Sequence, residues 1–100
     1  MKFLLIRKPR MGTGMTPTSE TVRAHKDTVL GTLERGETDC VYAFVGGGGC
    51  AILNADSAEE LNQRLMGAPL GLFYEYEIRA LADYGQFMDT MAKALEKQNR

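Results

Sequence analysis

Four short apolar runs along the chain have the length and residue types of β-strands. They are Lys2–Arg7, Cys40–Val45, Cys50–Ala55 and Leu72–Leu81. Bulky aliphatic and aromatic side chains dominate the first three runs, and apolar and charged side chains alternate in the last one. Gly46–Gly49 separates the two middle runs, which predicts a hairpin with a flexible tip.

Three amphipathic stripes lie between and after these runs and predict helices. In the first stripe, apolar or weakly polar residues recur every three or four positions, at Val22, His25, Val29 and Leu33. The hydroxyl of Thr18 or Ser19 can cap its start, and Gly36 can end it.

The second helix is predicted from Asp56 or Ser57, either of which can cap it, to the breakers Gly67 and Pro69. The third begins near Ala82, with its apolar stripe at Tyr84, Met88, Met91 and Leu95. The element order is therefore β-α-β-β-α-β with a C-terminal helix.

This order predicts an α+β, ferredoxin-like domain with a four-stranded antiparallel sheet, formed by residues 1–100 as a single domain. Both crossover helices cover one face of the sheet. The other face carries too many apolar residues to stay in water, so we expect a dimeric α/β barrel in which the third helix reaches toward the partner. The predicted partner is another copy of this chain, in a homodimer or a larger homo-oligomer.

Composition and charge narrow the function. The formal net charge is −1 with acidic and basic residues mixed, so we expect no nucleic-acid partner. No run approaches the ~18 apolar residues of a membrane span, and the apolar start is too short for a signal peptide. We therefore expect a cytoplasmic protein with no membrane partner.

The two cysteines, Cys40 and Cys50, are too few for a disulfide framework or a metal site. With Gly46–Gly49 as the hairpin loop, they lie about five residues apart along the ladder, on the order of 16 Å. A disulfide needs Cα atoms within about 7 Å, so the sequence predicts two free thiols. We expect no metal and no cofactor.

Two residues are candidates for acid–base chemistry. His25, the only histidine, lies on the inner stripe of the first helix and could shuttle a proton near neutral pH. The alternative is a core histidine bonded to a carbonyl or hydroxyl. Glu75 shares a face of the last strand with Glu77 and Arg79 and could be a base if that face lines a cavity; the alternative is a set of ion pairs.

Further residues are candidates for substrate binding. Tyr42, Tyr74 and Tyr76 could form hydrogen bonds with a lactone carbonyl or a phenol in an otherwise apolar pocket, although packing is the alternative for each. Arg7 closes the first strand and could bind a substrate carboxylate, with solvent exposure as the alternative. The loop Lys8–Pro17 could close such a pocket.

The second half of the chain resembles muconolactone Δ-isomerases over about thirty residues, Asn54 to Leu81. The matching residues are Asp56-Ser57-Ala58-Glu59-Glu60-Leu61, Leu65, Gly67, Pro69-Leu70, Glu77-Ile78 and Ala80-Leu81. A weaker resemblance, to the YCII-related family, lies in Ala24-His25, Gly48-Gly49 and Asp56-Ser57, but Ala68 stands where that family has an Asp before Pro69. Both resemblances imply a ferredoxin-like dimeric α/β barrel.

The residues and the resemblance leave three functions open. The first is a cofactor-free isomerase-like enzyme that acts on a small lactone or carbonyl compound by proton transfer. The second is a non-catalytic oligomeric protein that binds a small ligand or serves assembly. The third is a cofactor-independent monooxygenase of the same architecture. A closed apolar cavity that holds His25 with at least one Tyr or Arg pointing inward would favour the enzyme, and a filled cavity would favour the non-catalytic protein.

Overall fold

The computed structural model describes residues 1–12, 14 and 16–98 and confirms the predicted order of elements. The elements are β1 (Lys2–Pro9), α1 (Ser19–Glu34), β2 (Thr38–Ala43), β3 (Gly49–Asn54), α2 (Ala58–Gly67), β4 (Tyr74–Leu81) and α3 (Tyr84–Gln98). The chain therefore has a ferredoxin-like α+β fold with an additional C-terminal helix.

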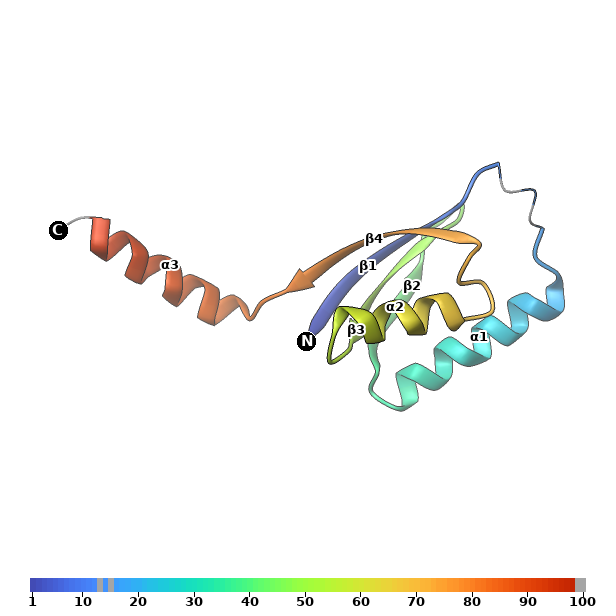
Figure 1. Cartoon of the computed structure of the whole chain (residues 1–100), viewed down its shortest axis with the longest axis horizontal. Helices are drawn as coiled ribbons and strands as arrows, with labels where there is room; N and C mark the ends of the chain where they lie inside the picture. Colours follow the sequence, from blue (N-terminus) through green and yellow to red (C-terminus); the bar gives the residue numbers. More distant parts are fainter. Residues whose placement is uncertain (13, 15, 99–100) are drawn as a thin grey trace.

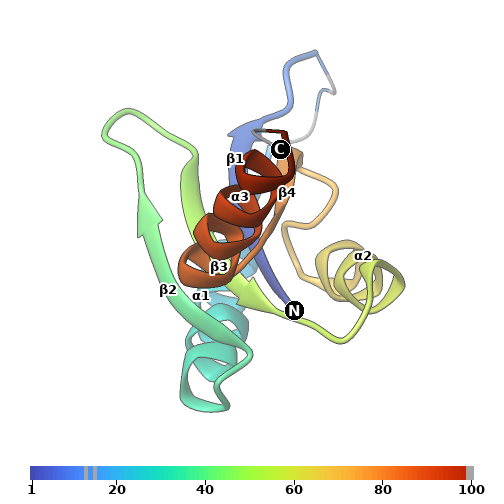
Figure 2. The ribbon, with the colours of Figure 1, turned by 90° about the vertical axis from the view of Figure 1, so that its left-hand side faces the viewer.

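The four strands form one antiparallel sheet in the order β2-β3-β1-β4 (Figures 1 and 2). The apolar strand β1 is central, and Leu5 pairs with Ala51 of β3 on one side and with Ile78 of β4 on the other. Helices α1 and α2 both lie on one face of this sheet (Figure 1). Side chains that point to this face are Phe3, Leu5 and Arg7 of β1, since side chains alternate along a strand.

The core lies between the sheet and the two crossover helices. Its buried residues are Phe3, Leu5, Ala51, Leu53, Ala55 and Leu61. Leu61 comes from α2, whose Leu65 packs against the same cluster. Burial of one such side chain stabilises a fold by roughly 1.5–3 kcal/mol, so this cluster fixes the position of the sheet beneath the helices.

Polar caps set the helix boundaries close to where the sequence predicts them. The hydroxyl of Thr18 accepts a hydrogen bond from the backbone N–H of Thr21 (3.1 Å), and Ser57 accepts one from Glu60 (3.1 Å). Gly36 follows α1 with φ of 75°, a left-handed conformation that glycine adopts without strain. These caps satisfy backbone groups that a helix leaves unpaired.

The hairpin differs from its prediction in register. Strand β2 spans Thr38–Ala43, so it begins and ends two residues earlier than predicted. Residues 44–48 form the connection, in which Gly46, Gly47 and Gly48 take positive φ, and Ala43 is opposite Gly49. Cys40 is then opposite Ile52 and Cys50 opposite Tyr42. The predicted wide separation of the cysteines is wrong: they lie two positions apart on one face. Both thiols are free, as predicted.

The second face of the sheet carries no helix of this chain (Figure 1). By alternation along the strands, its apolar residues are Leu4, Ile6, Cys40, Cys50 and Ile52. We call these five residues the open face. They are only half-buried. Glu75, Glu77 and Arg79 of β4 lie on the same side of the sheet, so the apolar second face that the sequence predicts is found along β1, β2 and β3.

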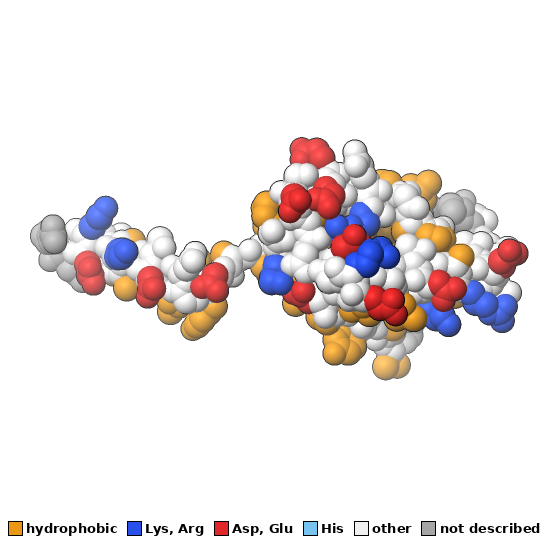
Figure 3. Space-filling view, turned by 90° about the horizontal axis from the view of Figure 1, so that it is seen from below, with side chains coloured by type: hydrophobic (Ala, Val, Ile, Leu, Met, Phe, Trp, Pro, Cys, Tyr) orange, Lys and Arg blue, Asp and Glu red, His pale blue; other side chains and the backbone are white. Residues whose placement is uncertain are grey.

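Helix α3 extends away from the sheet as a separate arm (Figures 1 and 3), which gives the chain dimensions of 62 × 31 × 26 Å. It begins at Tyr84, and Asp83 accepts a hydrogen bond from the backbone N–H of Gln86 (2.9 Å). None of its described residues is buried. Among the described helices, none has both the length and the apolar character that crossing a membrane requires.

Candidate functional site

A cavity of about 320 Å³ lies between α1, the end of α2 and the inner face of the sheet. Leu5, Ala51 and Leu53 form its apolar floor. Its polar lining includes Arg7 and His25, and aromatic rings come from Tyr74 and Tyr76. A mostly apolar hollow with a few convergent polar groups is the usual form of a small-molecule site.

Arg7 extends from the end of β1 across the neighbouring strand. Its Nη2 donates a hydrogen bond to the backbone carbonyl of Tyr42 (3.4 Å), and its guanidinium carbon is 5.7 Å from the ring centroid of Tyr74. Gly49 makes this path possible, since a Cβ at that position would collide with the Arg7 guanidinium. No described aspartate or glutamate forms an ion pair with Arg7.

His25 is held by the turn that follows α2. The backbone N–H of Leu70 donates a hydrogen bond to its Nδ1 at 3.1 Å, which joins α1 to a segment 45 residues away. Burial, and to a smaller extent the charge of Arg7, lowers the pKa of His25 below 6.5. The imidazole is therefore neutral at pH 7.

The tyrosines of β4 complete the cavity wall. The hydroxyl of Tyr76 donates a hydrogen bond to the backbone carbonyl of Gly71 (2.8 Å), and burial raises the pKa of this hydroxyl above 10.0. The ring of Tyr74 lies between its neighbours, 6.3 Å from His25 and 6.4 Å from Tyr76 between ring centroids. His25 and Tyr76 thus both anchor the turn at residues 68–73.

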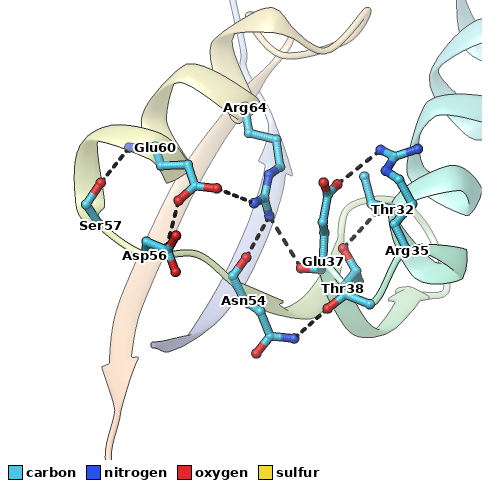
Figure 4. A network of polar contacts seen from close by, with 10 residues as sticks. Thr32, Arg35, Glu37, Thr38, Asn54, Asp56, Ser57, Glu60 and Arg64 are labelled. Atoms are coloured by element: carbon cyan, nitrogen blue, oxygen red, sulfur yellow. Dashed lines mark hydrogen bonds and ion pairs between the residues drawn. The ribbon is translucent and has the colours of Figure 1, made fainter.

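At its other end the cavity reaches Arg64 of α2, whose donors are engaged. Its guanidinium donates hydrogen bonds to the backbone carbonyls of Asn54 (3.0 Å) and Glu37 (3.3 Å) and pairs with Glu60 (3.3 Å), as Figure 4 shows. This network ties α2 to the ends of β2 and β3. We therefore read Arg64 as a structural residue.

The charges around the cavity have one sign. Arg7, Lys26 and Arg64 line it, and no aspartate or glutamate is among its described lining residues. Because Arg64 already pairs with Glu60, Arg7 and Lys26 are the lining cations that form no described ion pair. A half-buried guanidinium without a carboxylate favours an anionic ligand, which would form charge-assisted hydrogen bonds with it.

The structure brings together three of the residues that the sequence selects: His25, Arg7 and Tyr74. Tyr42 contributes its backbone carbonyl, while the residue is 68% exposed and opposite Cys50, on the side of the sheet that carries the open face. Glu75 is not brought into the cavity. Its register partner in β1 is Lys8, and both side chains lie on the other face of the sheet, because alternation along β4 turns Tyr74 and Tyr76 inward and Glu75 outward.

The sequence predicts that the loop Lys8–Pro17 closes the pocket. No described residue of this loop lines the cavity, and Thr13 and Met15 lie outside the described residues. Two residues at the cavity were not selected from the sequence: Lys26 lines it, and the backbone N–H of Leu70 holds His25. Lys26 follows His25 directly, but Leu70 acts through its backbone, which leaves no signal in the residue type. The described residues contain no group of three His, Cys, Asp or Glu side chains that could hold a metal ion.

The comparisons with known proteins identify the fold. No protein-family model matches the chain, and no curated protein matches its sequence. Among solved structures, muconolactone isomerase is similar with a TM-score of 0.72 and 18% sequence identity, covering 84% of this chain and 91% of that one. A 5-chloro-2-hydroxyhydroquinone dehydrochlorinase from Burkholderia phenoliruptrix, in complex with 2,5-dihydroxybenzoquinone, is similar with a TM-score of 0.59 and 20% identity, covering 86% and 98%.

These likenesses confirm that the chain has the fold of muconolactone isomerase, as the run from Asn54 to Leu81 predicts. At such identities they establish the fold and leave the reaction to be argued from the site. The weaker resemblance to YCII-related proteins stays a prediction.

Proposed function

We propose that this chain, which has the fold of muconolactone isomerase, is a cofactor-free isomerase-like enzyme that acts on a small anionic lactone or carbonyl compound by proton transfer. The observation that carries the proposal is the cavity charge: Arg7 and Lys26 line an apolar hollow beside His25, with no acidic side chain in the described lining. The volume of about 320 Å³ suits a compact single-ring compound.

The residues that line the cavity would contact different parts of such a substrate. Arg7 would bind the carboxylate, because a guanidinium offers two parallel N–H donors to it. The apolar floor of Leu5, Ala51 and Leu53 would hold the ring. Because the described lining holds no carboxylate, a water molecule in the cavity would take the proton from the carbon beside the carbonyl and return it to another carbon. Loss of that proton puts negative charge on the carbonyl oxygen, and His25 is the polar group of the lining that could stabilise this charge.

The cavity favours an enzyme over an inert assembly protein, since a purely structural domain has no need of an unpaired cation and a half-buried histidine in one hollow. A binding protein without turnover would use the same contacts. The two are separated by a reaction at carbon, which only the enzyme accelerates.

The test uses γ-carboxy-γ-butyrolactone, which carries a carboxylate and a lactone carbonyl on one ring. Its protons beside the carbonyl are followed by proton NMR in heavy water with and without the protein. The proposal predicts binding and faster exchange of these protons for deuterium. Binding without faster exchange would indicate a ligand-binding protein, and neither binding nor exchange would refute the anion site as well.

We also propose a homo-oligomer of at least two copies. The open face is apolar and carries no helix of this chain, and α3 exposes a stripe that contains Phe87 (55% exposed), Met91 (42%) and Leu95 (51%). Hydrophobic side chains gather along one side of this arm (Figure 3). A second copy of the chain would bury both of these apolar surfaces. Two sheets commonly pack face to face in proteins.

A further inference from the structure

His25 uses its two ring nitrogens differently, and this decides what the residue can do. Nδ1 accepts the hydrogen bond from the backbone N–H of Leu70 at 3.1 Å. A backbone N–H is always a donor, so Nδ1 must present a lone pair and carry no hydrogen. In a neutral imidazole the hydrogen is then on Nε2.

Nε2 is accessible to a ligand. It has no hydrogen-bond partner among the described residues. It is not sealed in the core, because the described, non-exposed residues contain no fully buried side-chain nitrogen or oxygen without a partner. His25 lines the cavity beside Arg7 and Tyr74, so a ligand there would border the ring that carries the Nε2–H group.

From this geometry we infer that His25 is a hydrogen-bond donor to the carbonyl oxygen of the bound compound, through Nε2–H, and is not the base that removes a proton from carbon. The inference rests on the proposed function and names the role of one residue in it. A base would need a lone pair on Nε2, with the ring hydrogen on Nδ1, where it would collide with the N–H of Leu70. A fixed neutral N–H that polarises a carbonyl is an established device in proton transfer beside carbonyls.

The neutral donor fits its surroundings. Burial and the nearby charge of Arg7 both disfavour an imidazolium at this position. An uncharged ring beside Arg7 leaves that cation as the anchor for the carboxylate. A compound that carries both an anionic group and a carbonyl could then contact Arg7 with the first group and His25 with the second.

The first test reads the ring directly and needs no ligand. Since His25 is the only histidine in the chain, histidine labelled with ¹⁵N gives signals from this ring alone. The inference predicts, at pH 7, a hydrogen-bearing Nε2 and a bare Nδ1. A ring with its hydrogen on Nδ1, or an imidazolium at pH 7, would overturn it.

The second test measures the contact with the carbonyl by comparing dissociation constants of two acids. γ-Carboxy-γ-butyrolactone has the carbonyl, and tetrahydrofuroate has the same ring and carboxylate without it. The wild type should bind the lactone acid about fivefold to tenfold more tightly, as expected for one hydrogen bond in a half-buried site.

Two variants separate the donor role from a structural role. His25→Gln keeps an N–H donor near the position of Nε2, and His25→Asn keeps an acceptor near the position of Nδ1 for the N–H of Leu70. A donor to the carbonyl predicts that the preference for the lactone acid survives in H25Q and is lost in H25N. Survival of the preference in H25N would show that His25 does not contact the carbonyl.

The outcomes also distinguish this inference from the proposed function. If neither acid binds the wild type, the anion site fails, and the carbonyl contact inferred for His25 fails with it. If both acids bind with the same affinity, the anion site stands and the donor role falls.

Discussion

The guanidinium of Arg7 lies over the ring of Tyr74, with its central carbon 5.7 Å from the ring centroid. This contact orients a cation that has no described carboxylate partner, and it places the cation at the edge of the cavity that also contains His25. A guanidinium on an aromatic face keeps the N–H groups at its edge for other partners. One of them reaches the carbonyl of Tyr42, and the others remain for a ligand.

Replacement of Arg7 should remove the anion site and spare the fold. Arg7→Met should weaken binding of γ-carboxy-γ-butyrolactone at least tenfold, because a charge-assisted hydrogen bond contributes roughly 1.5–3 kcal/mol. Isothermal titration calorimetry measures this loss. Lys8→Met is the matched control, since Lys8 is the next residue of β1, exposed and on the other face. Equal losses in the two variants would contradict a specific site at Arg7.

Stability should fall in acid as His25 takes up a proton. The folded pKa of His25 is lowered, so the unfolded chain binds the proton first, and stability is full above pH 6.5 and decreases as the pH is lowered from there toward the folded pKa. The charged ring must also give up the hydrogen bond from Leu70. Arg7, Tyr74 and Lys26 are the titratable or charged groups that line the cavity near it.

Urea unfolding at pH 7.5 and at pH 5.0 measures this effect, and His25→Gln removes it. Asp39 and Glu37 also have lowered pKa values, caused chiefly by hydrogen bonds from Lys2 and Arg35, respectively, and these carboxyls lose their contribution as the pH falls below their unfolded values of 3.8 and 4.5. His25→Gln retains both carboxyls, so the difference between this variant and the wild type isolates the contribution of the histidine. A stability that is flat between pH 7.5 and pH 5.0 in the wild type would contradict the buried neutral ring.

Loss of the Tyr76 hydroxyl should destabilise the turn at residues 68–73, which lies beside the cavity. Tyr76→Phe removes the hydrogen bond to the carbonyl of Gly71 and should cost about 1 kcal/mol of unfolding free energy. Tyr84→Phe is the control, because Tyr84 is 77% exposed on α3. Chemical denaturation compares the two. A Tyr76→Phe variant as stable as Tyr84→Phe would show that the turn does not depend on this bond.

Charges on α3 should disrupt the proposed oligomer. Phe87→Glu with Met91→Glu places two carboxylates on the exposed apolar stripe of α3, which should shift the sedimentation coefficient toward that of the protomer of 11.1 kDa. Gln86→Glu adds a charge beside the stripe without removing an apolar side chain and should leave assembly intact. A wild type that sediments as a protomer at micromolar concentration would refute assembly altogether.

The fold was predictable from local patterns because each element carries its own signals. Ser57 with Glu60 marks the start of α2, and the alternation from Tyr74 to Leu81 assigns each side chain of β4 to a face. The hairpin register was not predictable in the same way. Three glycines with positive φ can close several loop lengths, so residue types alone do not fix which strand positions pair.

The candidate site was predictable only in part, for a similar reason. Arg7 and Tyr74 stand at positions whose direction follows from strand alternation, and His25 stands on the inner stripe of α1. Tyr74 faces the cavity and Glu75 does not, because the helices cover the face of the sheet to which Tyr74 points. The packing of the whole chain decides which face the helices cover. The N–H of Leu70 that selects the state of His25 belongs to the backbone and leaves no trace in the sequence.

The most direct test of the account is a crystal structure of the protein with γ-carboxy-γ-butyrolactone bound. We predict that the ligand lies inside the cavity between α1 and the sheet. Its carboxylate should contact the Arg7 guanidinium, and its lactone carbonyl oxygen should accept a hydrogen bond from Nε2 of His25. A ligand bound instead at Glu75 and Glu77 on the other face, or one that reaches neither Arg7 nor His25, would contradict it.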